Sequence, residues 1–217
     1  MSSPAPITQD GAAWLLSVTA FAVSMAATPG PNNAMVTASG ATFGFLRTLP
    51  HMFGVAIGFA VMIAAVALGA GAPLRDWPWL RESLRWLGAA YLLWLAWHIA
   101  VARPSSQGRA DAGEAGSRKS RPLTFFQAAL FQWVNPKAWV IAAGAVVTYT
   151  TARGDAFLVQ CGTVALIFLA ITFPSVALWT AVGAGAARVL RSERALRAFN
   201  ICMALLLVAS LVQILRE

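Results

Sequence analysis

Charged side chains are scarce in this sequence of 217 residues. Only 8 residues are Asp or Glu and 16 are Lys or Arg, so charged residues make up 11% of the chain, against about 25% in ordinary soluble domains. Hydrophobic residues make up 59%. Apolar runs of about 20 residues, the length that crosses a bilayer, recur along nearly the whole chain. We therefore expect a membrane protein with no separate soluble domain.

Cysteine and histidine are nearly absent, with two of each. Cys161 and Cys202 lie in apolar segments without a CxxC or His-rich neighbourhood, which favours neither a disulfide framework nor a zinc site. His51 has no recognisable partner, although proton shuttling there stays open. A channel or metal exporter should show rings of carboxylate, His or Cys ligands. A membrane thiol-electron carrier needs cysteines beside proline breaks. These classes stay open as alternative functions, and no cofactor, metal ligand or catalytic residue is predicted.

The basic residues give a net charge of +8 and lie in short clusters between apolar segments. Loops that face anionic lipid have this pattern, so we expect membrane lipid, and no nucleic acid, as a partner. The loops of one side hold more than twice as many Lys and Arg residues as the loops of the other. By the positive-inside rule the central loop is cytoplasmic and both termini are periplasmic. Residues 1–10 carry no Lys or Arg, so we expect the first apolar segment to be retained.

Six apolar segments can be drawn along the chain. In lipid a span must satisfy its own backbone hydrogen bonds, and no segment shows the alternation of a barrel strand, so all six are expected to be helices. Residues 103–122 are polar and rich in Gly and Ser. They predict a cytoplasmic linker between a first repeat, 1–102, and a second, 123–217. The segments are 11–43, 48–72, 84–102, 124–150, 156–186 and 195–215.

The two halves resemble each other. ALGAGA at 67–72 recurs as AVGAGA at 181–186, and RESLR at 81–85 recurs as ERALR at 193–197. The order and nearly constant offset of these matches indicate an internal repeat. A repeat of three crossings has opposite orientations in its two copies, which is the inverted-repeat plan of many secondary transporters. We therefore predict an all-α membrane protein of six transmembrane helices in two inverted three-helix repeats. Broken helices at matching positions would mark its substrate site.

The first break is TPGPNN at 28–33, inside an otherwise apolar segment. Proline has no N–H, so Pro29 and Pro31 cannot donate to the carbonyls of Met25 and Ala27. A helix is expected to restart here, with its free N–H groups pointing back into the break. Carbonyl oxygens suit an ammonium group and a helix N-terminus suits a carboxylate, so one break fits both ends of a zwitterionic amino acid.

The second break, in the fourth segment, is the sequence NPK at 135–137. Pro136 is expected to leave the carbonyl of Gln132 free and to begin a helix, with Asn135 as the cap in the place that Gly30 takes in the first break. Lys137 adds a cation about halfway along its segment. A charge inside the membrane is costly and usually functional, so we assign Lys137 to the substrate carboxylate and consider it for proton coupling.

The predicted substrate site combines both breaks, whose amide side chains can each donate and accept. Tyr91 is added because an aromatic ring can hold an ammonium group by a cation–π contact. The structural alternative is that the prolines only kink two helices and that Lys137 snorkels toward an interface. The predicted substrate-binding residues are Pro29, Gly30, Pro31, Asn32, Asn33, Tyr91, Gln132, Asn135, Pro136 and Lys137.

Two other patterns predict packing. A small residue at every fourth position permits close helix contact. A proline inside a span makes a kink whose freed backbone is satisfied by neighbouring hydroxyls, as expected for Pro174 between Thr172 and Ser175. The glycine pairs at this spacing are Gly40 with Gly44 and Gly54 with Gly58.

The sequence resembles the LysE/RhtB family of amino-acid exporters. The resemblance rests on TPGPN at 28–32 followed by a Gly-spaced helix, on WLGAAYLLWLAW at 86–97 and on FQWVNPKAW at 131–139. It covers nearly the whole chain. It implies a bacterial inner-membrane protein that exports amino acids or close derivatives, driven by the proton motive force, with no enzyme activity. The family motif implies the same break residues as the site.

The chain departs from the family pattern at Asn32, where many members have Asp. No Asp or Glu lies clearly within any of the six segments, so the usual carboxylate proton carrier is missing. A cationic substrate would also lack a counter-charge, while Lys137 would repel it. We therefore expect small neutral or aliphatic amino acids as substrates, with protons as the coupling ion. The sequence leaves open whether the protein forms a homo-oligomer.

Overall fold

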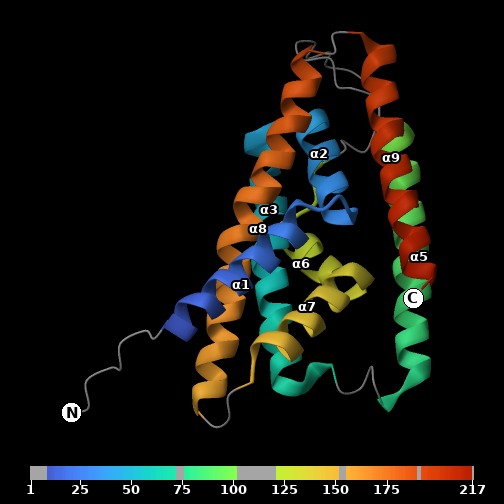
Figure 1. Cartoon of the computed structure of the whole chain (residues 1–217). Helices are drawn as coiled ribbons and strands as arrows, with labels where there is room; N and C mark the ends of the chain where they lie inside the picture. The colour runs from blue at the N-terminus through green and yellow to red at the C-terminus, as the bar shows by residue number, and fades with distance from the viewer. Residues whose placement is uncertain (1–8, 72–75, 102–120, 152–154, 190–191, 217) are drawn as a thin grey trace.

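The computed structural model describes residues 9–71, 76–101, 121–151, 155–189 and 192–216 (Figure 1). Every element in these ranges is a helix, which confirms the predicted all-α class. The predicted linker lies almost wholly outside the described residues. The first half contains α1 (Gln9–Ala27), α2 (Pro31–Phe43), α3 (Phe45–Ala65), the π-helix η1 (Val66–Ala70) and α5 (Pro78–Val101). The second half contains α6 (Phe125–Val134), α7 (Pro136–Tyr149), α8 (Asp155–Val189) and α9 (Glu193–Arg216).

Within the described residues, 3 helices are long and apolar enough to cross a membrane. They are Phe45–Ala70, Glu82–Val101 and Ala156–Ala187. A fourth span results if α1 and α2, which are bent by 55° at their break, cross together. The other predicted segments correspond to α6 with α7 and to α9, which do not meet the same criterion. A multi-pass membrane protein follows, whereas six spans are not established by helix length and composition.

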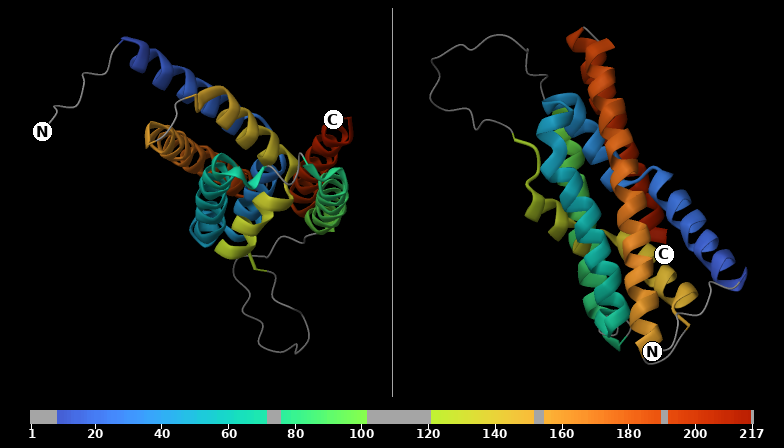
Figure 2. Two further views of the ribbon diagram at one scale, coloured as in Figure 1. Left: turned by 90° about the horizontal axis from the view of Figure 1, so that it is seen from below. Right: turned by 90° about the vertical axis from the view of Figure 1, so that its left-hand side faces the viewer.

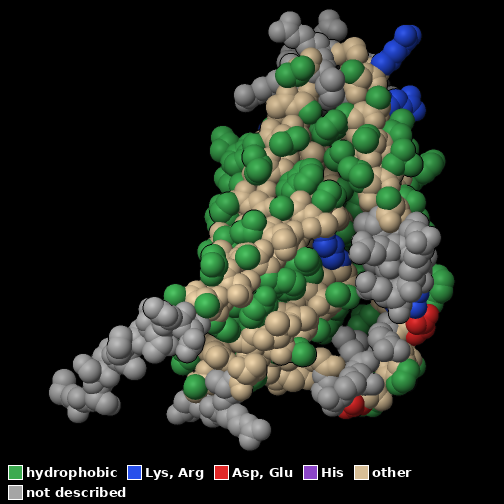
Figure 3. Space-filling model, viewed as in Figure 1, with side chains coloured by type: hydrophobic (Ala, Val, Ile, Leu, Met, Phe, Trp, Pro, Cys, Tyr) green, Lys and Arg blue, Asp and Glu red, His purple; other side chains and the backbone are tan. Residues whose placement is uncertain are grey.

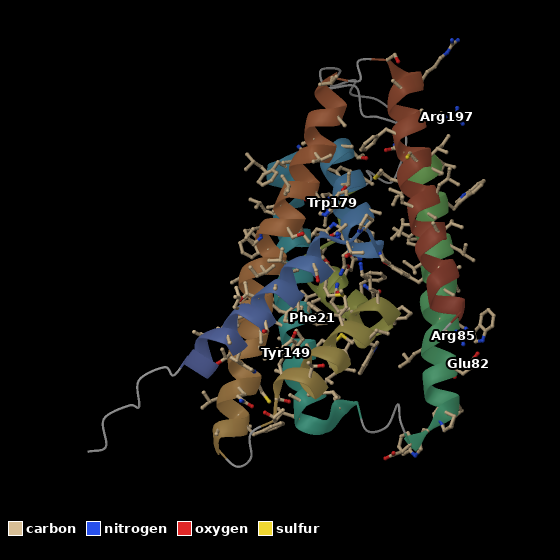
Figure 4. The ribbon with its side chains drawn as sticks, viewed as in Figure 1. Phe21, Glu82, Arg85, Tyr149, Trp179 and Arg197 are labelled. Atoms are coloured by element: carbon tan, nitrogen blue, oxygen red, sulfur yellow. The ribbon has the colours of Figure 1, made fainter. Side chains whose placement is uncertain are left out.

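The helices form a central group with a pair of helices on each flank (Figure 2). α1 and α7 lie together on one flank, where Phe21 and Tyr149 face each other with ring centroids 5.7 Å apart (Figure 4). α5 and α9 run side by side on the other flank. The centre is made by α2, α3, α6 and α8, whose shared buried residues are Val36, Met52, Val55, Ala128 and Val176.

Glycines allow the central helices to touch backbone to backbone. A methyl group added at Gly40 would overlap the Thr180 carbonyl, and one at Gly183 would overlap the Thr37 carbonyl, so α2 and α8 meet through both residues. Gly54 and Gly58 place α3 equally close to α6, against Phe125 and Ala129 respectively. The predicted packing role is therefore confirmed for Gly40, Gly54 and Gly58.

Gly44 has a different role from the predicted one. It is both the C-cap of α2 and the N-cap of α3, and nothing lies within 4 Å of the position where its Cβ would be. Its φ of 82° lies in the region that glycine adopts without strain. One residue therefore turns the chain from α2 into α3, and the expected loop between the first two segments shrinks to this corner.

The repeated motifs do not share one conformation. RESLR and ERALR both lie in the first turns of long helices, α5 and α9. AVGAGA lies inside α8, which continues to Val189. The described part of ALGAGA instead falls on η1 and its end, where Gly69 has a φ of 100°. At this position the two halves are therefore similar in sequence but differ in backbone conformation.

The outer surface fits a bilayer. Hydrophobic side chains spread over the flanks in Figure 3, while Lys and Arg side chains gather at its upper end near the start of α9. Leu166 and Leu178 on α8, for example, are exposed. Lipid tails cover such side chains as well as a protein core does.

Candidate functional site

The first break lies between α1 and α2. α1 ends at Ala27, and Gly30 caps α2 with an extended backbone, φ −176° and ψ −177°. Pro31 occupies the first helical position, as predicted. The N–H of Thr28 still donates to the Ser24 carbonyl at 3.1 Å, so the regular backbone pattern is lost only after this residue. The first N–H groups of α2 have no acceptor within their helix and point toward the break.

The second break is shorter, because only Asn135 separates α6 from α7. Asn135 is the predicted cap and Pro136 takes the first helical position. The prediction that the Gln132 carbonyl is free was wrong, since it accepts the N–H of Asn135 at 3.3 Å. The Asn135 carbonyl accepts the N–H of Ala138 at 3.0 Å. The backbone of this break is thus nearly satisfied from within.

Two amide side chains fasten the breaks to each other. Asn32 Nδ2 donates to Gln132 Oε1 at 2.9 Å, and Gln132 Nε2 returns a bond to Asn32 Oδ1 at 3.2 Å. Gln132 also donates to the Ala128 carbonyl at 2.9 Å and is fully buried. Both side chains were predicted to contact substrate. The structure brings them together as a reciprocal pair that joins α2 to α6.

The Ala26 carbonyl, at the open end of α1, receives two side-chain donors. Asn33 Nδ2 lies 2.9 Å from it and 3.1 Å from the Thr28 carbonyl, and Ser175 Oγ on α8 lies 2.9 Å from it. These donors replace backbone N–H groups that the break removes. Ser175 was expected to satisfy the backbone freed by Pro174 in its own helix. It instead binds the break of the other half.

Lys137 crosses from α7 to the first break. Its Nζ donates to the Thr28 carbonyl at 3.0 Å and to the Pro29 carbonyl at 3.2 Å. The side chain is half-buried, and no described Asp or Glu forms an ion pair with it. Gly30 makes room for it, because a Cβ there would lie 2.9 Å from Nζ. The Lys137 ammonium thus occupies the carbonyls of the break, where the ammonium group of a substrate could otherwise bind.

A small cavity of about 50 Å³ lies between these groups. A single water needs about 10–15 Å³ of such volume, so this form holds only a few water-sized groups. Asn135 is 2% exposed, lines the cavity, and has a buried Oδ1 with no partner among the described residues. Buried polar atoms in proteins normally have a hydrogen-bond partner, so this oxygen is a candidate acceptor for a bound ligand. The cavity therefore presents one cation and one open acceptor.

The predicted residues fall into three groups. The residues that line the cavity are Gly30, Pro31, Asn32, Asn33, Asn135 and Lys137. Pro29, Gln132 and Pro136 stand behind it and contribute a carbonyl, the amide pair and a helix start. Tyr91 is elsewhere on α5, with ring centroids 5.6 Å from Trp94 and 5.3 Å from Phe131.

Sequence reasoning missed the part of the lining that comes from α3 and α8. Phe59 and Phe168 give an apolar wall, while Thr172 and Ser175 add hydroxyl groups. The two phenylalanines carry no signal, since a buried aromatic looks like core. The two hydroxyl residues do carry one, because they flank Pro174 in the middle of a long apolar segment.

Gly30→Ala tests whether Lys137 needs the space that is free because Gly30 has no side chain. Because the backbone is extended, alanine fits there without backbone strain, and the methyl group displaces only the end of a flexible side chain. We expect normal folding and a fall in transport of about tenfold, the effect of losing about 1.4 kcal/mol. Gly144→Ala on α7 is the control, since nothing lies within 4 Å of its Cβ position. Equal transport by both variants would show that the Lys137 position is unimportant.

Comparison with known proteins gives one family. The family model of the LysE type translocator matches residues 23–216. Proteins named cysteine/O-acetylserine efflux protein from Escherichia coli O157:H7, Escherichia coli strain K12 and Shigella sonnei are similar to the chain. Each is 30% identical over 195 residues, which covers 89% of this chain and 93% of the relative. No solved structure matches the chain.

Proposed function

The chain belongs to the LysE type translocator family, and from this premise we propose that it is a secondary active transporter that exports small neutral amino acids across the bacterial inner membrane. The observation that carries the proposal is the bond between the Lys137 ammonium and the Thr28 and Pro29 carbonyls. A cation and exposed carbonyls at one break are the groups that a zwitterion needs. Cysteine and O-acetylserine, which the relatives' names give, are neutral amino acids of this size.

Substrate binding exchanges partners at the break. The substrate carboxylate takes the Lys137 ammonium, aided by the N-terminal N–H groups of α2. The carbonyls of Thr28 and Pro29 then accept the substrate ammonium, with Asn135 Oδ1 as a further acceptor. Each charged group exchanges one partner for another and is never unpaired in the membrane, where an unpaired charge costs free energy. Asn32, Asn33, Gln132, Pro31 and Pro136 hold the two breaks in the geometry for this exchange.

The same arrangement disfavours cationic substrates. A second ammonium, as in lysine, would meet Lys137 and find no acidic side chain in the cavity lining. Protons are the coupling ion of the proposal. Lys137 is its candidate carrier, because no Asp or Glu among the described residues lies in the cavity lining.

Export from proteoliposomes tests the function. Vesicles carrying the purified protein are loaded with cysteine, O-acetylserine, serine and lysine, and an outward or inward pH gradient is imposed. We expect the three neutral amino acids to leave faster than from protein-free vesicles, at a rate that follows the gradient, and lysine to stay. Retention of all four under either gradient contradicts the proposal.

For the architecture we propose six crossings in two inverted repeats, with domains 1–102 and 123–217 joined by the linker 103–122. Each half then has a broken first span, α1 with α2 and α6 with α7, followed by two spans. Equivalent prolines at the first turns of α2 and α7 support the match. So do α5 and α9, which follow in corresponding places and pack on each other.

Cysteine labelling tests the proposed orientation, in which the central linker is cytoplasmic and both termini are periplasmic. Leu46→Cys lies at the exposed corner between α2 and α3, and Thr151→Cys lies between α7 and α8. With Cys161 and Cys202 replaced by serine, an impermeant maleimide should label only Thr151→Cys in intact cells. A permeant reagent should label both. Labelling of Leu46→Cys from outside would reverse the topology.

A further inference from the structure

A second cavity, of about 480 Å³, lies at the other end of α2. The start of α2 lines the small cavity at the break, and its residues from Met35 to Phe43 line this one. The last turns of α5, the start of α9 and residues 121–123 close it. Arg197 on α9, one turn before Asn200 of the lining, marks this end of the molecule in Figure 4. This is the end where basic side chains gather and which we propose to be cytoplasmic.

The wall of this cavity is mainly apolar but carries polar groups. Ser39 and Asn200 are buried, His98 and Arg121 stand at the exposed side, and Trp94 supplies an aromatic face. His51 on α3 is 1% exposed, and neither of its ring nitrogens has a hydrogen-bond partner among the described residues. Buried polar groups are normally hydrogen-bonded. An imidazole and a guanidinium on one cavity are suited to a carboxylate.

The two cavities are neighbours along one seam. His51 lines the large cavity, and Val55, one turn later on the same face of α3, lines the small one. One turn of helix is about 5.4 Å. Between Asn33 and Ser39 on α2 stands Met35, which is buried and has a long, flexible side chain. A small molecule in the large cavity is therefore about one helical turn from the break, and the Met35 side chain lies between them.

We propose that the large cavity is a second binding site for the exported amino acid, which holds the substrate carboxylate between His51 and Arg121 on its way to the break. This inference rests on the proposed function and adds a loading site to it. Its volume lies in the range of about 300–1,000 Å³ that small-molecule sites occupy. The small cavity takes only a few water-sized groups in the same structure. The substrate thus waits in the large cavity until Lys137 leaves the carbonyls of Thr28 and Pro29.

Protection of an introduced cysteine tests the site. Ala38→Cys, in a chain whose own cysteines are serine, places a thiol on the wall of the large cavity, and Ala138→Cys places one at the break. N-ethylmaleimide modification is followed in detergent with and without O-acetylserine. At ten times the dissociation constant, we expect modification of Ala38→Cys to slow about tenfold. The methyl ester of O-acetylserine, which lacks the carboxylate, should not protect.

Second substitutions separate the two sites. Lys137→Met should remove protection at Ala138→Cys and leave it at Ala38→Cys. His51→Leu should remove protection at Ala38→Cys, and His51→Gln, which keeps a donor, should restore it and also controls for misfolding. Export without any protection at Ala38→Cys would overturn the loading site and leave the proposed function intact. Protection that Lys137→Met abolishes at both cysteines, or that phospholipid gives in place of the amino acid, would also overturn it. Absence of both export and protection would reject both proposals.

Discussion

Lys137→Met is expected to lower export by about 10- to 100-fold while the protein remains inserted. The substitution keeps an unbranched apolar stem, one atom shorter, but removes the ammonium that binds the Thr28 and Pro29 carbonyls. A hydrogen bond to a charged group contributes about 1.5–3 kcal/mol, and each 1.4 kcal/mol is a factor of ten. The measurement is the initial rate of O-acetylserine efflux from proteoliposomes under a pH gradient.

Two further variants make this result specific. Arg47→Met removes an exposed cation in the first turn of α3 and should export like the parent protein. Lys137→Arg keeps a permanent charge, so it should bind substrate but lose the dependence on the pH gradient, because Arg stays protonated. Near-normal, gradient-driven export by Lys137→Met would refute the role of Lys137. Retained coupling in Lys137→Arg alone would remove only its role as proton carrier.

Gly183→Ala is expected to destabilise the protein, whereas Gly185→Ala, two residues later in α8, is not. The added methyl at Gly183 overlaps the Thr37 carbonyl and would lie 3.1 Å from the Ala41 nitrogen, so α2 and α8 must separate. Overpacking of this kind costs about 1–3 kcal/mol. Nothing lies within 4 Å of the Cβ position of Gly185, and alanine there raises helix propensity by about 1 kcal/mol.

Thermal unfolding in detergent measures this difference. A cost of 1–3 kcal/mol lowers the midpoint by about 2–12 °C in a chain of this size, and Gly185→Ala should match or exceed the parent midpoint. Gly40→Ala acts on the same contact from the other helix and should behave like Gly183→Ala. Equal midpoints for Gly183→Ala and Gly185→Ala would mean that α2 and α8 are not held at backbone contact.

The sequence was sufficient to predict features that depend only on neighbouring residues, such as helix breaks and caps. Proline has no N–H and prefers the first turn of a helix, which was enough to place both breaks and the caps at Gly30 and Asn135. The hydrogen-bond partners across the two breaks could not be predicted from the sequence. Asn32 and Gln132 are 100 residues apart, and many polar residues competed for each of them. Only the packing of α2 on α6 selects the pair.

Other residues lie elsewhere than their patterns predict, because one sequence pattern is compatible with two structures. Gly40 and Gly44 have the spacing of a packing motif, yet only Gly40 touches a neighbouring helix. Tyr91 fits the chemistry of a cation–π site, but it lies outside the cavity lining with its ring against Trp94 and Phe131, so its role in binding stays a prediction. The position of Ser175 beside Pro174 predicts a bond within its own helix, whereas its bond to the Ala26 carbonyl depends on α1 passing beside α8.

The corner at Gly44 makes α2 a short lever with its pivot at the far end from the break. α2 has 13 residues, about 20 Å of helix. A tilt of about 10° at the pivot would carry its first turn through about 3 Å, which is the length of a hydrogen bond. So small a swing would separate Asn32 from Gln132 and the break from Lys137 together. We therefore expect the first turn of α2 to move and its end at Gly44 to stay fixed during transport.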